Sequence, residues 1–196
     1  MGEIGIFHKC RVYLYNNAND FYMKKIPIIL LENKKVILTP LLESDFERLF
    51  EVASDKMIWV QHPNPDRFKR EVFQKYFEGA IQSEGAFLIS NAVTGDIIGS
   101  TRFYDYDAKA RLIKIGYTFF SRVCWGHHFN KEAKWLMLHH AFNYVDKVHF
   151  EVGAQNIRSQ KAMERLGAEK IIEQEVTYYG ELPKHNFVYE MKKGAG

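Results

Sequence analysis

IGYTFFSRVCWGHHFNKEAK, residues Ile115 to Lys134, is the stretch that decides the fold. Its first six residues, Ile115 to Phe120, are apolar or aromatic for the most part, which predicts a buried strand. A short turn around Gly126 follows, and an amphipathic helical pattern begins after Asn130. A strand that passes through a turn into a helix leaves backbone N–H groups without partners, and the helix dipole adds positive potential there. The stretch therefore predicts a cradle for a pyrophosphate group.

Composition is that of a soluble globular protein with one domain. Of the 196 residues, 46% are hydrophobic and 26% are charged. The net charge of +3, from 27 basic and 24 acidic residues, is too balanced to favour nucleic acid as a partner. The two cysteines, Cys10 and Cys124, form no disulfide framework and favour the cytoplasm. The longest apolar run, Ile26 to Leu31, contains a proline and is too short to span a bilayer, so no membrane is expected.

The first part of the chain is less regular than the rest. Residues 1–22 contain a loop-like run of asparagines and are interpreted as an N-terminal extension, which leaves 23–196 as the single domain. The elements expected next are a strand at 36–38, a helix capped by Ser44 with Glu47 reaching back, and a second helix that begins near Asp66.

From residue 86 onward strands predominate. The pattern predicts an antiparallel meander of strands at 86–90, 97–104 and 111–120, then a helix at 131–145, a strand at 147–152, a helix at 156–166 that ends at Gly167, and strands at 171–178 and 187–191. The strand–helix–strand unit in the middle requires 111–120 and 147–152 to be parallel neighbours. The order predicts an α+β fold with a mixed, mostly antiparallel central sheet flanked by helices.

A metal site is one interpretation of Cys124, His127 and His128, which lie within five residues. Such a site would need a further ligand from elsewhere, and no nearby residues have zinc-finger spacing. We therefore expect no metal and interpret the two histidines as loop residues.

Two motifs in this order resemble those of the GNAT superfamily of acetyl-CoA-dependent N-acetyltransferases. The likeness is greatest to its Rim-type branch, the ribosomal-protein N-terminal acetyltransferases and their relatives. The resemblance covers about residues 34–192 and implies the GNAT fold, with acetyl-CoA as co-substrate and an amine as acceptor. The first motif comprises Ile115–Thr118, Trp125-Gly126 and Asn130–Lys134, and the second runs from Asn156 to Ala168.

The family's phosphate-binding turn reads Gln/Arg-x-x-Gly-x-Gly/Ala and maps onto residues 123–128. Gly126 matches this pattern, whereas Val123 and His128 depart from it. Because the loop acts through backbone N–H groups, side-chain changes need not abolish phosphate binding. The resemblance implies that the cofactor is bound by Phe119, Phe120, Cys124, Trp125, Gly126, His127, His128, Phe129, Asn130, Asn156 and Ser159.

The resemblance also places Asn156 at the pantetheine arm and Ser159 near the sulfur. The departing CoA thiolate must be reprotonated, and Ser159 is the expected donor because this helix lacks the tyrosine that many relatives carry. The residues alone allow another interpretation, in which Asn156 is only a helix cap and Ser159 only a first-turn residue.

Acetyl transfer to an amine needs a base as well as an acid. Glu151, at the end of the strand before Asn156, is the expected base, and Glu132 and Glu175 are its rivals. Tyr117 would steer the acceptor or polarise the thioester carbonyl, and the backbone N–H of Phe119 is the candidate oxyanion donor.

The function predicted is direct acetyl transfer from acetyl-CoA to a primary amine, so Cys124 is not expected to be a nucleophile. The acceptor is a protein N-terminal amine, a polyamine or an aminoglycoside-like amine. A non-catalytic acyl-CoA-binding module is the alternative. The loops His62–Pro65 and Tyr178–Glu181 would cover the cleft or form surface turns. The sequence leaves the oligomeric state, including a homodimer, open.

Overall fold

The computed structural model describes residues 25–176 and 183–194. The expected extension at 1–22, the predicted loop Tyr178–Glu181 and the last two positions of the strand predicted at 171–178 lie outside these residues. The division into an extension and one domain therefore stays a prediction.

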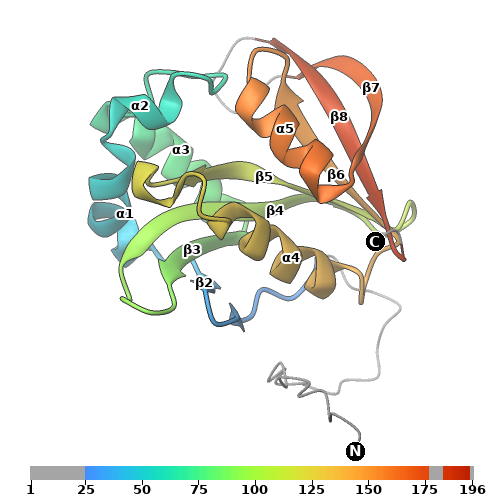
Figure 1. Ribbon diagram of the computed structural model, residues 1–196, viewed down its shortest axis with the longest axis horizontal. Coiled ribbons are helices and arrows are strands. Elements are labelled where there is room, and N and C mark those ends of the chain that lie inside the picture. Colours follow the sequence, from blue (N-terminus) through green and yellow to red (C-terminus); the bar gives the residue numbers. More distant parts are fainter. Residues whose placement is uncertain (1–24, 177–182, 195–196) are drawn as a thin grey trace, which may run out of the picture.

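An eight-stranded sheet forms the centre of the molecule (Figure 1). Its spatial order is β1-β2-β3-β4-β5-β6-β8-β7, and β5 and β6 are the parallel pair among antiparallel neighbours. This confirms the mixed, mostly antiparallel α+β sheet and the predicted parallel neighbours. The strands are β1 (Leu31–Glu32), β2 (Val36–Pro40), β3 (Ala86–Asn91), β4 (Ile97–Asp107), β5 (Leu112–Phe120), β6 (Lys147–Gly153), β7 (Glu169–Val176) and β8 (Lys184–Lys192).

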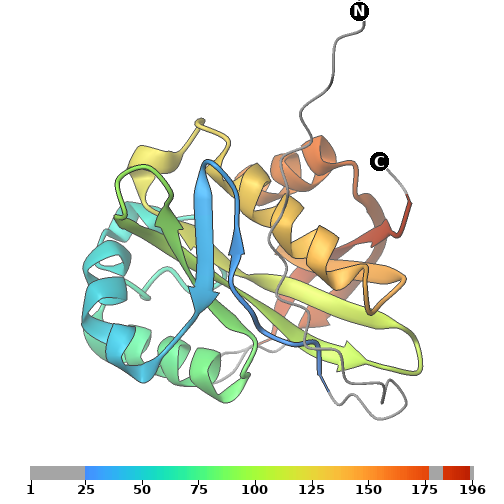
Figure 2. The ribbon, with the colours of Figure 1, turned by 90° about the horizontal axis from the view of Figure 1, so that it is seen from below.

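Helices cover both faces of this sheet, with α1–α3 on one side and α4 on the other (Figure 2). Alternate residues of β3 enter two separate cores, as strand geometry requires. Phe87 and Ile89 pack with α4, whereas Ala86 and Leu88 pack with α1–α3. The helices are α1 (Phe46–Ala53), α2 (Lys56–Trp59), α3 (Arg70–Gln82), α4 (Phe129–Ala141) and α5 (Ile157–Leu166).

The predicted capping box at the first helix was wrong. A 3₁₀ turn, Glu43–Asp45, precedes α1, and the Leu42 N–H donates to the Asp45 carboxylate at 3.0 Å. Glu47 does not reach back, because its carboxylate instead pairs with Arg70 on α3. The carboxylate of Asp45, three positions after Leu42, therefore takes the reaching-back role that was assigned to Glu47.

The helix expected to begin near Asp66 begins at Arg70. Residues Asp66 to Lys69 form a turn that is closed by a hydrogen bond from the Lys69 N–H to the Asp66 carbonyl, at 2.9 Å. The sequence analysis also missed β1 and α2, which have two and four residues and are too short to show a period.

The pairing of β5 with β6 is short. It runs only from Leu112 opposite Lys147 to Lys114 opposite His149. Beyond Ile115 the two strands separate, while β5 stays paired with β4 and β6 stays paired with β8. The edges that face each other across this gap carry backbone groups outside the β5–β6 ladder, so the gap suits a ligand that can form hydrogen bonds.

Candidate active site

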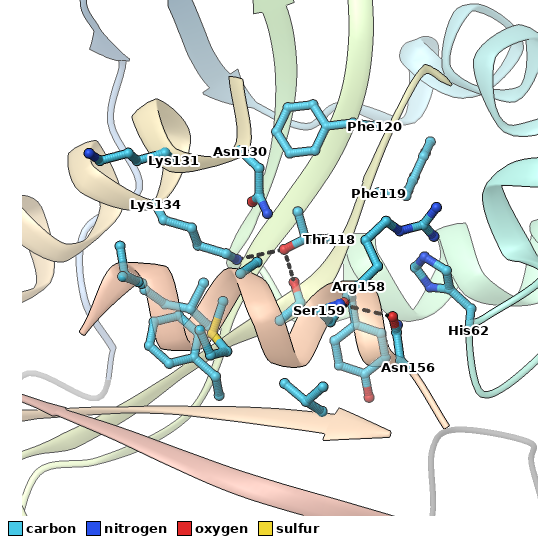
Figure 3. Close-up of a pocket in the computed structure, with 18 of the residues that line it drawn as sticks. His62, Thr118, Phe119, Phe120, Asn130, Lys131, Lys134, Asn156, Arg158 and Ser159 are labelled. Carbon is cyan, nitrogen blue, oxygen red and sulfur yellow. Dashed lines mark hydrogen bonds between the residues drawn. The ribbon is translucent and has the colours of Figure 1, made fainter. Parts of the chain in front are cut away.

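A cavity of about 400 Å³ opens where β5 and β6 separate (Figure 3). Its walls come from β5, β6, α4, α5 and the turn before α4. The volume lies within the range of small-molecule sites. Of the residues expected to bind the cofactor, His127 is absent from the wall, and those that line it are Phe119, Phe120, Cys124, Trp125, Gly126, His128, Phe129, Asn130, Asn156 and Ser159.

The turn before α4 presents backbone N–H groups to this cavity. The His128 side chain accepts no hydrogen bond from the first turn of α4, so the N–H groups of Phe129, Asn130 and Lys131 have no intrahelical acceptor. Gly126 has a φ of 79°, and the space beside its Cα is open. The buried Oδ1 of Asn130 has no hydrogen-bond partner among the residues that the structure describes. These groups fit the pyrophosphate and neighbouring polar groups of a CoA-type ligand.

His128 occupies the N-cap position of α4 with a φ of 64°, a left-handed conformation that favours glycine. The family pattern has Gly or Ala at this position. The residue that departs from the pattern, His128, therefore has a strained backbone. Trp125 is anchored at the strand–helix corner, where its indole N–H donates to the Phe120 carbonyl at 3.2 Å. The Arg158 guanidinium lies over the Trp125 ring, 3.9 Å from the ring centre.

Asn156 is the N-cap of α5, and its Oδ1 accepts the Ser159 N–H at 3.1 Å. The residue is buried, and it lines the cavity together with Ser159. The interpretation of Asn156 as a helix cap therefore explains its position fully. Its predicted role at the pantetheine arm stays a prediction.

The strand β5 carries a bulge at Tyr117. Ser100 of β4 pairs with Phe119, but Arg102 pairs with Gly116, so the register shifts between them. Tyr117 has a φ of 51°, and its carbonyl accepts the Tyr76 hydroxyl. The Arg102 guanidinium lies 3.4 Å from the centre of the Tyr117 ring. Bulges of this kind redirect backbone groups beside active sites, and here the bulge lies on the cavity wall.

Glu151 lies on the cavity wall, but its carboxylate is already engaged. It accepts from Lys114 Nζ at 2.6 Å, from the Tyr104 hydroxyl at 3.2 Å and from Gln174 Nε2 at 3.3 Å. The Glu151 side chain is only 3% exposed. Burial alone would lower the pKa of Lys114, but hydrogen bonds to Glu151 and Asp105 outweigh it and raise that pKa. The ammonium group is therefore a lasting partner of Glu151.

The two rival carboxylates do not line this cavity. Glu132 lies in the first turn of α4 and accepts from the Asn33 amide at 2.9 Å. Glu175 is exposed on β7. Among the three candidates for the base, Glu151 alone has a position on the cavity wall.

Lys134 is the residue of this site that the sequence analysis missed. It lies on α4, is 4% exposed, and its Nζ donates to Thr118 Oγ1 at 2.7 Å. Burial lowers its pKa to about 7. The available signal was its spacing, since Lys134 precedes Met137 by three residues and Ala141 by seven and so belongs to the buried stripe of the helix.

The loop that begins at His62 lies on the cavity wall, as one of its two predicted interpretations requires. Burial, together with the positive charges of Arg67 and Arg158, lowers the pKa of His62 to about 3. The imidazole is therefore neutral at physiological pH and donates or accepts hydrogen bonds without a charge.

Cys124 is a free, buried thiol whose pKa is raised by burial. Over residues 25–176 and 183–194, the structure brings together no group of three or more His, Cys, Asp or Glu side chains able to hold a metal ion. The described helices also include none with the length and apolar character needed to cross a bilayer.

A model of the acetyltransferase (GNAT) domain matches residues 35–169. The chain belongs to the GNAT acetyltransferase family. Members of this family transfer an acetyl group from acetyl-CoA to an acceptor. No curated protein matches the sequence closely enough to refine this assignment.

Solved structures show the same GNAT fold. A GCN5-related N-acetyltransferase from Brucella melitensis is 19% identical with a TM-score of 0.72, and the match covers 86% of this chain and 80% of that one. A protein described as a ribosomal-protein-serine acetyltransferase from Vibrio cholerae is 15% identical, with a TM-score of 0.67 and coverage of 86% and 100%. RimJ from Mycobacterium smegmatis, in complex with CoA-disulfide, is 13% identical, with a TM-score of 0.63 and coverage of 80% and 81%.

Proposed function

We propose that this chain is an N-acetyltransferase that moves the acetyl group of acetyl-CoA to a primary amine by direct attack. The observation that carries the proposal is the set of unpartnered N–H groups at the start of α4, which open into the gap between β5 and β6. The helix end suits the pyrophosphate, and the gap suits an extended arm whose amides complete the strand edges.

In the proposed reaction the amine nitrogen attacks the thioester carbon, and the C–S bond breaks as the C–N bond forms. Glu151 takes the proton of the amine, directly or through a water molecule. The Phe119 N–H stabilises the oxyanion, while Tyr117 orients the acceptor. Ser159 is the hydroxyl beside the sulfur.

The acceptor is proposed to be a protein N-terminal amine, as expected for the Rim-type branch, or a small-molecule amine. The likeness to the Vibrio cholerae and Mycobacterium smegmatis proteins supports this branch at the level of the fold. Incubation with acetyl-CoA and a panel of ribosomal-protein N-terminal peptides, polyamines and aminoglycosides tests it, with acetylated product detected by mass spectrometry.

The decisive experiment combines calorimetry with turnover. The chain should bind CoA and acetyl-CoA, and the release of free CoA should depend on an added amine. Glu151→Gln should lower kcat by about a hundredfold, and Ser159→Ala should lower it less. If neither ligand binds, the proposal is wrong.

A non-catalytic acyl-CoA-binding module is the second candidate, and the ion pair between Lys114 and Glu151 favours it, because the carboxylate proposed as the base already accepts hydrogen bonds from the protein. Binding of CoA without turnover of any amine would support this candidate. A cytoplasmic location and a homodimer are further proposals, which cell fractionation and size-exclusion chromatography with light scattering test.

A further inference from the structure

Lys134 is a buried lysine with no carboxylate partner among the residues described. Its Nζ donates to Thr118 Oγ1 at 2.7 Å and to Thr101 Oγ1 at 3.5 Å. The ring of Phe150 is the other close neighbour, with its centre 5.6 Å from Nζ. A buried lysine that serves only structure is normally paired with an acid, so this one calls for another explanation.

The position of Lys134 coincides with the reacting end of the proposed site. Thr118, its hydrogen-bond partner, lies between Tyr117 and Phe119, the residues assigned to the acceptor and to the oxyanion. Figure 3 shows Lys134 extending from α4 toward Thr118, and it shows Ser159 of α5 among the residues that line the same cavity. Lys134, Thr118 and Ser159 all line the cavity.

The chemistry of the leaving group requires an acid at this place. A thiolate has to be protonated as the C–S bond breaks, and a donor works best when its pKa is near the working pH. The hydroxyl of Ser159 is a much weaker acid than a thiol, so it can pass a proton on but cannot supply one. An ammonium group whose pKa burial lowers to about 7 can supply it.

We propose that Lys134 is a catalytic acid of this site, whose ammonium group returns a proton to the CoA sulfur as the acetyl group leaves. The C–S electron pair takes up the proton from Nζ, CoA departs as the thiol, and the neutral amine of Lys134 regains a proton from solvent. The inference rests on the proposed function, because it assumes that acetyl-CoA occupies this cavity.

The described charged groups near Lys134 do not provide it with a carboxylate partner. Glu151, the acid on this wall among the described residues, is paired with Lys114. On the strands and helices around it, the titratable and charged side chains that line the cavity are Tyr104 of β4, Tyr117 of β5, Glu151 of β6, Arg158 and Arg165 of α5, and Lys131 of its own helix. Three of these six are cationic, two are tyrosines and one is a carboxylate, and burial is what lowers the pKa of Lys134.

The first test compares the binding of CoA with that of desulfo-CoA, which lacks the sulfur, by calorimetry. The wild type should bind CoA about tenfold more tightly than desulfo-CoA, and Lys134→Met should abolish this difference. Lys134→Arg keeps the charge and should retain the difference. Lys75→Met, at an exposed lysine on α3, is the matched control and should behave as the wild type.

The second test is turnover with an amine found active in the panel. Lys134→Met should lower kcat about a hundredfold and abolish the fall in rate above about pH 7. Lys134→Arg should be as slow, because a guanidinium does not release its proton. Circular dichroism establishes that each variant is folded.

The outcomes separate the two proposals. If the wild type binds neither CoA nor desulfo-CoA, the proposed function fails and this inference fails with it. If Lys134→Met weakens both ligands equally, Lys134 is only structural and the acid role is overturned while the proposed function stands. Acetylation of Lys134 itself, detected by peptide mass spectrometry after incubation with acetyl-CoA, would also overturn it.

Discussion

At the scale of single residues, two lysines have opposite surroundings: Lys134 lines the cavity, and Lys114 contacts Glu151 on its wall. Lys114 is paired with Glu151 and Asp105, which raise its pKa, whereas Lys134 has hydroxyl partners and burial lowers its pKa to about 7. The same type of side chain is therefore a fixed cation beside Glu151 and a titratable amine on the cavity wall at Lys134.

Lys114→Met should destabilise the protein by about 2 kcal/mol, because it leaves the buried Glu151 carboxylate without its cation. Urea denaturation at neutral pH measures the loss. Asp105→Asn is the control, since Asp105 is 62% exposed and its pair with Lys114 should contribute less than about 1 kcal/mol. Equal effects of the two changes would contradict this account.

Lys134→Met should stabilise the fold, most strongly at acid pH. Below about pH 7, folding must bury the ammonium group at a cost on the order of 5 kcal/mol, because the pKa falls from about 10.5 unfolded to about 7 folded. From there to about pH 10 the folded state holds fewer protons than the unfolded state, so the free energy of unfolding of the wild type rises with pH. The difference in stability between Lys134→Met and the wild type should therefore shrink. Denaturation at about pH 6 and about pH 9 checks this slope, and a gap that does not depend on pH would contradict it.

At the scale of elements, the strand β5 positions the proposed chemistry through close packing at its bulge. A Cβ added at Gly116 would lie 2.9 Å from the Tyr104 ring, and Tyr104 in turn donates to Glu151 at 3.2 Å. The absence of a side chain at this position therefore determines where the proposed base is held.

Gly116→Ala should displace Tyr104, with a loss of stability of about 1–3 kcal/mol and a lower kcat. Gly153→Ala is a matched control on β6, since its added Cβ meets the Asn186 side chain at an ordinary distance of 3.5 Å. Thermal denaturation and amine turnover measure both variants. If Gly116→Ala proves as stable and active as Gly153→Ala, the close packing of Gly116 against Tyr104 contributes to neither stability nor activity.

The turn before α4 permits a similar comparison at His128, which has a φ of 64°. His128→Gly should be more stable than His128→Ala by about 1 kcal/mol, because glycine takes the left-handed conformation without strain. Both variants lack the imidazole, so their CoA affinities by calorimetry also test whether the ring narrows the phosphate site. If the two stabilities are equal, the backbone at this position is not strained.

At the scale of the whole molecule, the sequence predicted the arrangement of the sheet better than the chemistry within it. Periodicity located the strands at 86–90 and 147–152 and the parallel pairing around α4, because long amphipathic elements leave a clear pattern. It did not locate the two-residue β1 or the four-residue α2. The capping box predicted at Ser44 failed because Asp45 reaches back to the Leu42 N–H instead, while Glu47 pairs with Arg70.

The parts of the candidate site that are formed by local backbone geometry could be predicted from the sequence. The parts that depend on contacts between side chains distant in the sequence could not. The turn at Gly126 and the helix start at Phe129 follow from local sequence. The engagement of Glu151 by Lys114 depends on pairing across 37 positions of the chain, which no local pattern encodes. Lys134 was missed because a lysine within a helix is ordinarily assigned to the solvent face.

The short ladder between β5 and β6, from Leu112 to Lys114, has a mechanical consequence. Beyond Lys114, no strand pairing among the described residues joins β6 to β5, and so the sheet formed by β6, β7 and β8 is open on this side. An extended ligand lying in the gap would act as an added strand. Amide hydrogen exchange at residues 115–119 and 150–153 should therefore slow when CoA is added, and by more than at β2 and β3. The bound co-substrate would then stabilise the sheet, and each turnover would break and re-form the hydrogen bonds that it makes with β5 and β6.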